Sequence, residues 1–384
     1  MKISDKQNKF ALKAINSKTN LYSKQITLAI ASVICLAINY LLVWIAKNNQ
    51  EFIETYYSRG FYKEWSQLLT AINKWFSFSL SEVTYIIMIV IIIGLLLIMI
   101  KELISKDFKK ALTKLLIIVL VLSANVLYYQ ASWGLNNYRN DIETLFELSD
   151  RDIGLEELSK SYEYLVLQSN KYKSLSNIEM IPTKTEVLKN VYKGYENLSL
   201  KYEFIDGSVS VAKPLLISPL FSMSSYTGIY LPLFSEANIN DMPHISGIGF
   251  TASHELAHQK GFASEDEANF LGFLSGANHE EAYYKYSAYQ AMMIYVGNSL
   301  YKNDKDIYTE ISALRSDLVI KDLIAKRDFW DIHVNERTSE VHNQVNDAFL
   351  KANNQPDGII NYSKVTELFI KAYLDGLFEE YQEL

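Results

Sequence analysis

Three long stretches without a charged residue lie in the first third of the chain, Ile26–Ala46, Val83–Ile100 and Leu115–Tyr138. About 20 apolar residues in a helix cross the ~30 Å hydrocarbon core of a bilayer, and each stretch approaches or exceeds that length. The run YIIMIVIIIGLLLIMI in the second stretch is apolar on every side, so it cannot form a surface helix of a soluble protein. Buried helices of soluble proteins rarely run this long without a charge. We therefore predict three transmembrane helices.

The first stretch is predicted to be an uncleaved membrane anchor. Its leader of 25 residues and its apolar core are both too long for a cleaved signal peptide. It also ends in VWIAKNNQEF, which contains no A-x-A-like cleavage site. We therefore expect this segment to remain in the membrane.

Lysine is concentrated on one side of the predicted spans. Residues 1–25 contain six lysines and one acid, and the loop 101–114 between the second and third spans contains five lysines and two acids. Such positive segments remain in the cytoplasm. The loop 48–82 is balanced in charge and rich in Tyr, Phe and Trp, as expected at the outer face. We therefore predict a cytoplasmic basic tail (1–25), a three-helix transmembrane region (26–138) and an extracytoplasmic domain (139–384).

The predicted outer domain is acidic and contains no cysteine. Residues 1–135 carry 15 basic and 7 acidic side chains, whereas the whole chain has a formal net charge of −7, so the excess acid lies in the later part. This charge argues against nucleic acid as a partner. The only cysteine, Cys35, lies within the first predicted span, so no intrachain disulfide can form. The outer domain must therefore depend on its own core or on a metal.

Most of the outer domain has a helical pattern. The segments IGLEELSKSYEYLVLQSNKY, TEVLKNVYKGYENL and, after the turn NNQPDG, SKVTELFIKAYLDGLFEEY place apolar residues at helical spacing. Residues 208–234 are instead rich in Ser, β-branched and aromatic residues and contain three prolines, which predicts two or three short edge strands. Helical periodicity returns at about Gly247. We therefore predict a mainly α (α+β) fold with a small edge sheet.

The segment HELAH, residues 254–258, contains residue types that bind and use a metal. His254 and His258 are four residues apart, so on a helix both imidazoles leave the same face and can bind one ion. Zinc accepts neutral imidazole nitrogen at about 2.0–2.1 Å. The carboxylate of Glu255 could take a proton from an attacking water and pass it to a leaving amine. Chance predicts only about 0.007 such motifs in a chain of this composition, so the pattern is moderately specific.

A second helix is predicted directly after this motif, and it would supply the third ligand. Gly261 stands where a left-handed helix C-cap is expected, and Ser264 with Glu267 forms an S-x-x-E capping box. A catalytic zinc keeps three protein ligands and one open position. We favour Glu265 as the third ligand over Glu267, because Glu267 already has a role in the capping box. Asn269 shares a helix face with Glu265 and is predicted to hydrogen-bond a histidine ligand.

HELAHQ followed by E-x-x-A-N resembles the gluzincin pattern of zinc metallopeptidases. The resemblance implies that His254, His258 and Glu265 bind zinc and that Glu255 is the base. The spacing from His258 to Glu265 is shorter than in thermolysin-like enzymes, which keeps Glu267 as an alternative ligand. More broadly, WGLNNYR, GIYLPLFSEANIN and HELAHQKGFASEDEANF together resemble an uncharacterised bacterial family, a domain of unknown function with three spans and a zincin-like outer domain. This resemblance covers nearly the whole chain and implies no substrate.

These features predict a zinc metallopeptidase with one zinc ion in the bacterial cytoplasmic membrane. It would be a multi-pass protein with its N-terminus inside and its catalytic domain outside, and its partners would be the lipid bilayer and a peptide or protein substrate. One alternative is a zinc amidase acting on cell-envelope material, and another is a non-catalytic protein with a structural or ligand-sensing zinc site. A structural site would have four ligands, usually with thiolates, and would give Glu255 no purpose. Catalysis is therefore favoured.

The sequence does not identify a group that would stabilise an oxyanion. His333, Tyr362 and the tyrosines of residues 283–289 are candidates, and the sequence gives no choice among them. The segment SSYTGIYLPLF could bind an extended peptide at its edge or form a core strand. The remaining histidines are predicted to lie in loops (His244 and His279) or on a surface helix (His342).

Overall fold

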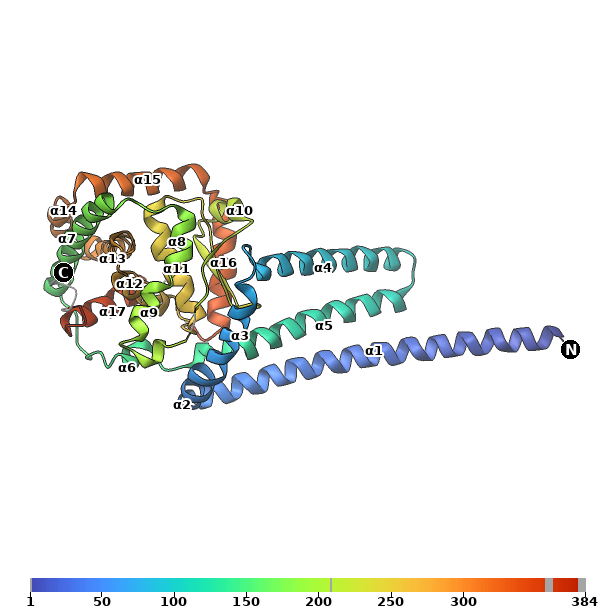
Figure 1. Cartoon of the computed structure of the whole chain (residues 1–384). Helices are drawn as coiled ribbons and strands as arrows, with labels where there is room; N and C mark the ends of the chain where they lie inside the picture. The colour runs from blue at the N-terminus through green and yellow to red at the C-terminus, as the bar shows by residue number, and fades with distance from the viewer. Residues whose placement is uncertain (1, 208, 356–361, 379–384) are drawn as a thin grey trace. The chain divides into compact units, whose positions relative to one another are not determined.

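The chain divides into two units in the computed structural model, which describes residues 2–207, 209–355 and 362–378. The first unit comprises Met1–Asn48 and Val83–Ser132, and the second comprises Asn49–Glu82 and Trp133–Leu384. The loop 49–82, which connects the first two predicted spans in the sequence, therefore belongs to the same unit as the region after the third span. Figure 1 labels the helices of both units.

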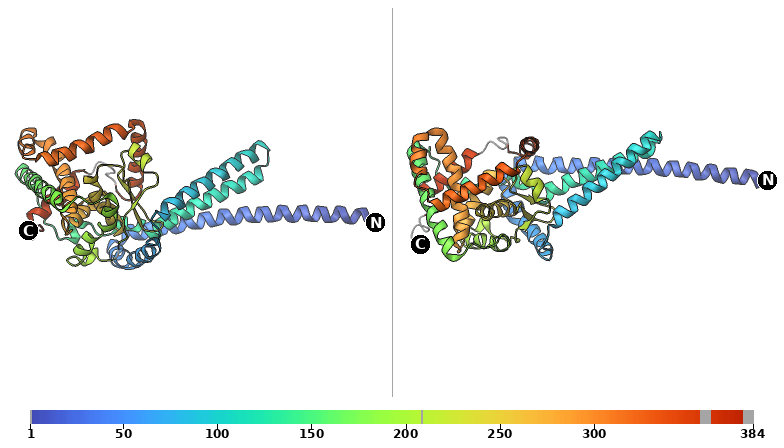
Figure 2. Two further views of the ribbon diagram at one scale, coloured as in Figure 1. Left: turned by 45° about the horizontal axis from the view of Figure 1, so that its top comes forward. Right: turned by 90° about the horizontal axis from the view of Figure 1, so that it is seen from above.

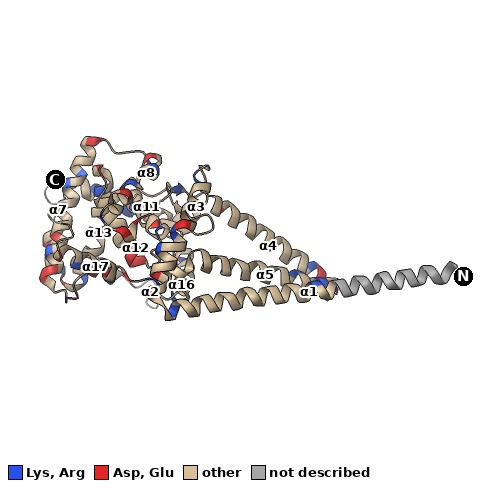
Figure 3. Ribbon diagram, turned by 60° about the horizontal axis from the view of Figure 1, so that its bottom comes forward, with Lys and Arg blue, Asp and Glu red and all other residues tan. Residues whose placement is uncertain are grey.

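The first unit consists of three long helices, α1 (Lys2–Asn48), α4 (Leu80–Ile104, whose first turn belongs to the second unit) and α5 (Phe108–Ser132). The segment Leu21–Asn48 of α1 and the whole of α4 and α5 are long and apolar enough to cross a membrane, which confirms the three predicted apolar helices. Figure 3 shows that their lengths are almost free of charge, while basic residues gather at the loop between α4 and α5. The protein is therefore associated with a membrane.

The packing of α1 against α5 includes a polar contact between the two helices. The Gln25 side-chain amide donates to the Thr113 hydroxyl (3.0 Å) and to the main-chain oxygen of Lys109 (2.7 Å). In the most hydropathic part of α4, none of the side chains is buried within the structure. A helix that exposes so much apolar surface requires a lipid environment.

The second unit is mainly helical. Its helices pack around a core rich in aromatic residues, and α7 lies along α13 at one side of that core (Figures 1 and 2). The helical elements are α2 (Gln50–Phe52), the π-helix η1 (Ile53–Tyr62), α3 (Lys63–Asn73), the 3-10 helix η2 (Gly134–Tyr138), α6 (Ile142–Leu145), α7 (Leu155–Glu179), α8 (Lys184–Asn190), α9 (Lys193–Ser199), the 3-10 helix η3 (Glu203–Ile205), α10 (Ser218–Met223), α11 (Ile245–Gln259), α12 (Glu265–Ala277), α13 (Ala282–Asn303), α14 (Lys305–Ser312), α15 (Asp317–His333), α16 (Glu336–Ala352) and α17 (Tyr362–Leu374).

These elements confirm the helical character predicted for the region. The first predicted segment forms α7, the last forms α17, and TEVLKNVYKGYENL forms the two shorter helices α8 and α9. The turn predicted from NNQPDG falls partly outside the described residues.

A small sheet of three short strands lies beside α11. Its strands are β1 (Lys213–Pro214), β2 (Gly228–Leu231) and β3 (Glu236–Ile239), in the order β1-β3-β2. β1 pairs with β3 in parallel, and β2 pairs with β3 in an antiparallel register in which Tyr230 faces Ala237. β1 and β2 are therefore edge strands, as the prolines in the sequence predicted.

Two short strands, β1 and β2, lie within residues 208–234, which confirms the prediction of two or three short strands for this range. Between them, residues 218–223 form the helix α10, which the sequence did not predict, and Pro219 lies in its first turn. Proline fits there because the first turn of a helix needs no hydrogen bond from its N–H groups. The central strand β3 lies just beyond the predicted range, because SEANI pairs with GIYL as a hairpin.

The helix pair α11 and α12 forms the part of the core that carries the HELAH segment. Gly272 of α12 lies directly against the backbone of His254, where an added Cβ atom would be 3.0 Å from the His254 nitrogen. A larger residue would press against this backbone, so glycine favours the close approach of the two helices. On the other side, α11 packs against β2 and β3.

Candidate metal centre

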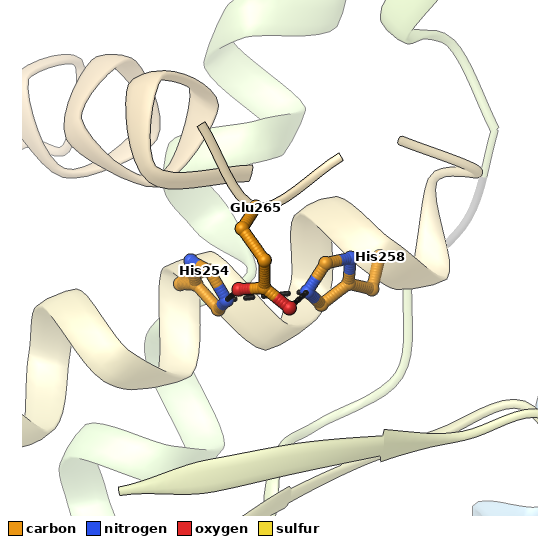
Figure 4. A group of neighbouring side chains, drawn as sticks. All are labelled: His254, His258 and Glu265. Carbon is orange, nitrogen blue, oxygen red and sulfur yellow. Dashed lines mark hydrogen bonds and ion pairs between the residues drawn. The ribbon is translucent and has the colours of Figure 1, made fainter. Parts of the chain in front are cut away.

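The two histidines of HELAH lie one turn apart on α11 and point to the same place. Their Nε2 atoms are 3.2 Å apart, with the rings at right angles (Figure 4). The Nδ1 atom of His258 lies 2.7 Å from the main-chain oxygen of Phe262. Because a carbonyl can only accept, Nδ1 carries the proton, and the Nε2 atom of neutral His258 presents its lone pair toward His254.

Glu265, from the first turn of α12, completes the group. One carboxylate oxygen lies 3.3 Å from Nε2 of His254 and the other lies 3.8 Å from Nε2 of His258. Figure 4 shows the carboxylate lying across both imidazoles. Among the described residues, these three side chains form the one group whose ligand atoms could hold a metal ion, all within 4.8 Å of one another.

A tight turn between the two helices makes this arrangement possible. Gly261 has a φ of +85°, and its N–H donates to the main-chain oxygen of His258 (3.0 Å). The N–H of Phe262 donates to the main-chain oxygen of Ala257 (3.1 Å). This is the left-handed C-terminal turn predicted from the sequence. A side chain at Gly261 would also collide with the ring of Tyr62, since an added Cβ atom would lie 2.9 Å from it.

Two of the three separations among these atoms match the spacing of ligands on a small tetrahedral ion, and the third, 3.8 Å from the His258 nitrogen to the other Glu265 oxygen, is longer. Two ligands at 2.0–2.1 Å from one ion, at the tetrahedral angle, lie about 3.3 Å apart. The distance between the two Nε2 atoms is 3.2 Å, and that from the His254 nitrogen to the nearer Glu265 oxygen is 3.3 Å. The His258 side chain is buried, whereas the Glu265 side chain is 41% exposed, so the group is open to solvent on one side.

The electrostatics favour the metal-binding protonation state at His258 and Glu265, but not at His254. Burial lowers the pKa of His258 to about 4, so this imidazole is neutral at pH 7. Burial alone would raise the pKa of Glu265, but the hydrogen bond with His254 and the electrostatic interactions with both histidines lower it to about 2. Burial also lowers the pKa of His254, yet the interactions with Glu265 outweigh it and the net shift is upward. Metal binding would therefore displace a proton from His254.

Glu255 lies on α11 beside the group, between the helix and strand β2. Its side chain is buried, and a Cβ atom added at Gly228 would lie 2.7 Å from one of its oxygens, so β2 can approach only because residue 228 is glycine. Burial raises the pKa of Glu255 to about 8, against the charge of His254 and a hydrogen bond from the backbone of Tyr230. The carboxyl group of Glu255 therefore interacts electrostatically with His254 and Glu265, and it accepts a hydrogen bond from the edge strand β2.

Glu267, the alternative ligand, points elsewhere. Its carboxyl group accepts a hydrogen bond of 2.8 Å from the main-chain N–H of Ile142, and burial raises its pKa to about 8. The predicted capping box was wrong. Ser264 is the N-cap residue of α12, but its hydroxyl bonds the Asp266 carboxylate and caps no backbone N–H. The hydrogen bond to Ile142 explains the difference, because it takes the Glu267 side chain that the capping box would use.

Asn269, which was predicted to hydrogen-bond a histidine ligand, lies next to His254. Its side chain interacts with the His254 imidazole and contributes to the raised pKa of that group. Its amide oxygen also accepts a hydrogen bond of 3.2 Å from the Tyr295 hydroxyl. Among the described residues, the buried Nδ1 atom of His254 nevertheless has no partner that meets hydrogen-bond geometry. Asn269 is therefore a neighbour of His254 whose contact is looser than a full hydrogen bond.

Several residues that the sequence did not single out hold the end of α11 in place. The Trp133 indole donates to the main-chain oxygen of His258 (2.8 Å), and Tyr62 donates to that of Gln259 (2.8 Å). Arg139 forms two hydrogen bonds of 2.9 Å with Glu54 and also donates to the main-chain oxygen of Gly261 (3.3 Å). Trp133 and Arg139 both belong to the segment WGLNNYR. An Arg and a Trp at this place in the sequence were the only local indication that the segment contacts the end of α11.

The candidates for an oxyanion-stabilising group have other partners. The four tyrosines of residues 283–289 are buried, and their hydroxyls bond to groups of the core. His333 ends α15 and stacks on Phe329, and the side chain of Tyr362 lies outside the described part. The other histidines lie where the sequence predicted: His244 just before α11, His279 between α12 and α13, and His342 on α16, stacked on Tyr226.

Comparison with known proteins identifies a family but no function. Residues 57–370 match the model of a family described as a protein of unknown function, DUF3810. The match includes the second and third apolar helices and all of the residues around HELAH. No curated protein and no solved structure matches the chain.

Proposed function

The chain belongs to the DUF3810 family of proteins of unknown function, and we propose that it is a membrane-anchored zinc metallopeptidase. The observation that carries this proposal is the convergence of His254, His258 and Glu265 at close to tetrahedral spacing, with the carboxyl group of Glu255 beside them. Two imidazoles and one carboxylate are a ligand set typical of catalytic zinc.

The character of this ligand set favours a catalytic site over a structural one. Structural zinc sites are closed by four ligands, usually including thiolates. The only cysteine of the chain is Cys35 in α1, and the described residues gather three ligands around this point. The partial exposure of Glu265 leaves one side open for a substrate.

In the proposed reaction, Glu255 moves the protons. Zinc supplies Lewis acidity when it is bound, which polarises a substrate carbonyl and acidifies water. Burial raises the pKa of Glu255 to about 8, but the charge of a bound zinc would lower it. The ionised carboxylate would then take a proton from the attacking water and deliver it to the leaving nitrogen. Its burial against β2 holds the carboxyl group in one place, so that it need not reorganise during the reaction.

Strand β2 supports a peptide as the substrate. Among the described strands, β2 pairs only with β3, so it forms an edge of the sheet. A substrate that adds to this edge as a further strand would gain main-chain hydrogen bonds regardless of its sequence. The Glu255 carboxyl group contacts the same strand, so a peptide bound there would lie near the proposed base.

The proposed location is the outer face of the cytoplasmic membrane. It rests on the lysines of residues 1–25 and of the loop 101–114, which by the positive-inside rule stay in the cytoplasm. With three spans, the second unit would then lie outside.

The test compares wild type with Glu255→Gln. Glutamine keeps the size of the side chain but cannot accept the proton, so bound zinc and melting temperature should stay near wild type. Turnover should fall by about 10²–10⁴-fold, the range for lost general acid–base catalysis. Glu163→Gln, on the exposed side of α7, is the matched control and should behave as wild type.

Because the substrate is not known, the readout is the set of peptides in membrane and secreted fractions of cells carrying each variant. Cleavage products found with wild type and Glu163→Gln, but not with Glu255→Gln, would support the peptidase. Changes confined to cell-wall peptides would favour an amidase. If all strains give the same products while His254→Ala still causes a defect, the metal has a role other than catalysis.

A further inference from the structure

The helix α3 turns a polar side toward the protein. Ser66 and Ser235 share a hydrogen bond of 2.7 Å between their hydroxyls, and both are buried. The Asn73 amide donates to the main-chain oxygens of Phe234 (2.8 Å) and Ser235 (3.1 Å). Leu69 is the one large apolar side chain of α3 that is buried. The inward side of this helix is therefore held mainly by hydrogen bonds.

The outward side of the same helix is mostly apolar, with the exposed Glu64 one turn before Leu68 as its charged residue. Leu68 and Ile72, and Trp75 just beyond the helix end, follow a spacing of four and three residues, which places them on one side. They are 53%, 44% and 81% exposed. Phe61, seven residues before Leu68, continues the line and is 53% exposed. These four residues are called the α3 apolar face.

This arrangement is the reverse of that in a helix on a water-exposed surface. Such a helix buries its apolar side and exposes its polar side, because apolar area in water costs about 25 cal/mol per Å². The α3 apolar face instead has its large side chains outward while serine and asparagine face the core. The reversal indicates that the environment outside α3 is less polar than water.

The position of α3 in the chain identifies that environment. The segment Leu21–Asn48 and helix α4, which begins at Leu80, are both long and apolar enough to span a membrane. Only residues 49–79 connect them, so both ends of this connection are fixed at a membrane surface. Tryptophan and bulky apolar residues are enriched at the boundary between headgroups and acyl chains.

We propose that the α3 apolar face is inserted into the headgroup–acyl boundary of the lipid bilayer, so that α3 is an interfacial helix of the second unit. The proposal is independent of catalysis. Tyr62, directly before α3, donates a hydrogen bond to the main-chain oxygen of Gln259, the residue after His258. The interfacial helix therefore holds the end of α11, and with it the candidate metal centre, close to the membrane surface.

Site-directed spin labelling of the full chain in lipid nanodiscs tests this insertion. Cys35 is the only cysteine, so Cys35→Ala gives a background for single labels at Leu68→Cys, Ile72→Cys and Trp75→Cys. Two controls have matched exposure outside this face: Met180→Cys (82%) for Trp75, and Leu318→Cys (42%) for Ile72. Each labelled variant must keep the elution volume and melting temperature of the background.

The expected result is a difference in access to two relaxation agents. Labels on the α3 apolar face should be accessible to oxygen, which dissolves in lipid, and several-fold less accessible than the controls to a water-soluble nickel chelate. Equal nickel access at all positions would overturn the proposal. Immobile labels shielded from both agents would also overturn it, because they would show that protein covers the face. Shielding found only in discs with two copies would assign the face to a dimer contact.

Discussion

At the scale of single residues, Glu265 and Glu267 are two positions apart and have opposite surroundings. Glu265 faces His254 and His258, whereas Glu267 accepts a hydrogen bond from Ile142. Glu265→Gln should remove most of the bound zinc, because one of three ligands is lost. Glu267→Gln should keep the metal. It should cost only about 1 kcal/mol of stability, because the glutamine amide oxygen can replace the neutral carboxyl group as the hydrogen-bond acceptor. Metal analysis of the purified protein distinguishes them, and zinc loss confined to Glu267→Gln would transfer the ligand role to that residue.

His279 predicts a loss of stability in acid. Its Nε2 donates to the main-chain oxygen of Asn190 and its Nδ1 accepts from the N–H of Glu281, so the neutral ring uses both nitrogens. Burial lowers its pKa to about 4, below the ~6.5 of an unfolded chain. The stabilisation is complete above pH ~6.5 and is lost as the pH falls toward 4, because only the unfolded chain binds the proton readily.

The corresponding measurement is the melting temperature between pH 7.5 and 4.5. Wild type should lose on the order of 2 kcal/mol over this range through His279. His279→Gln, which cannot titrate, should show a flatter pH profile by that amount, whereas His342→Gln, at a partly buried histidine whose pKa is also lowered by burial, should keep most of the slope of wild type. Parallel profiles for wild type and His279→Gln would contradict the assignment.

The residues around HELAH show what local spacing can and cannot predict. His254, His258 and Glu265 come together because helix periodicity and the Gly261 turn act over a few residues, and both can be recognised in the sequence. Glu267 accepts its hydrogen bond from Ile142, which is more than a hundred residues away in the sequence. The residues near Glu267 therefore could not indicate that this bond would replace the capping box. Gly228 also becomes meaningful only when the fold places Glu255 against it.

At the scale of elements, the end of α11 depends on a buried ion pair. Arg139 and Glu54 are both almost fully buried, and Arg139 also bonds the main-chain oxygen of Gly261. Arg139→Met would leave the buried Glu54 carboxylate with the partly exposed Arg59 (2.7 Å) as its ion-pair partner. The cost should therefore be at most about 3–5 kcal/mol, the cost of a buried charge that loses its partner entirely. Arg139→Met should therefore lower the melting temperature strongly and weaken metal binding, because the turn that orients His258 and Glu265 loses its support.

A double substitution separates loss of the pair from loss of a charge partner. Arg139→Met combined with Glu54→Gln should recover part of the lost stability, since no buried charge is then left without its main partner. The control is Arg327→Met, which breaks an exposed ion pair with Asp328 and should cost less than about 1 kcal/mol. If Arg139→Met behaves like Arg327→Met in thermal unfolding, the pair does not stabilise this end of α11.

Helices could be predicted from the sequence where the hydrophobic pattern alone determines them. The apolar helices and the amphipathic helices α7 and α17 follow from hydrophobic pattern alone. The helix at residues 218–223 could not be predicted, because a proline is compatible with an edge strand and with the first turn of a helix. Only tertiary packing decides between these two structures. The joining of residues 49–82 to the second unit depends on long-range bonds such as those from Leu80 and Ser81 to the Glu236 carboxylate, which no local pattern indicates.

At the scale of the whole molecule, the side of the membrane decides what the candidate metal centre can meet. The three apolar helices require that the basic tail and the later region lie on opposite sides if all three span. A centre outside the cytoplasmic membrane would encounter envelope and secreted peptides, whereas one inside would encounter cytoplasmic proteins. Orientation therefore determines which substrates the proposed peptidase could reach.

Reporter fusions measure this orientation directly. The loop 101–114 carries five lysines, and positive loops stay in the cytoplasm, so a fusion in this loop should give an active cytoplasmic reporter such as a fluorescent protein. A fusion after Leu384 should instead activate alkaline phosphatase, which matures only outside the cytoplasm because it needs disulfides. Replacing the five lysines of the loop by glutamine should weaken or invert both signals, whereas replacing Lys302 and Lys305, more than 150 residues after the third span in the sequence, should not. Phosphatase activity from the loop fusion together with none from the fusion after Leu384 would place the candidate metal centre in the cytoplasm.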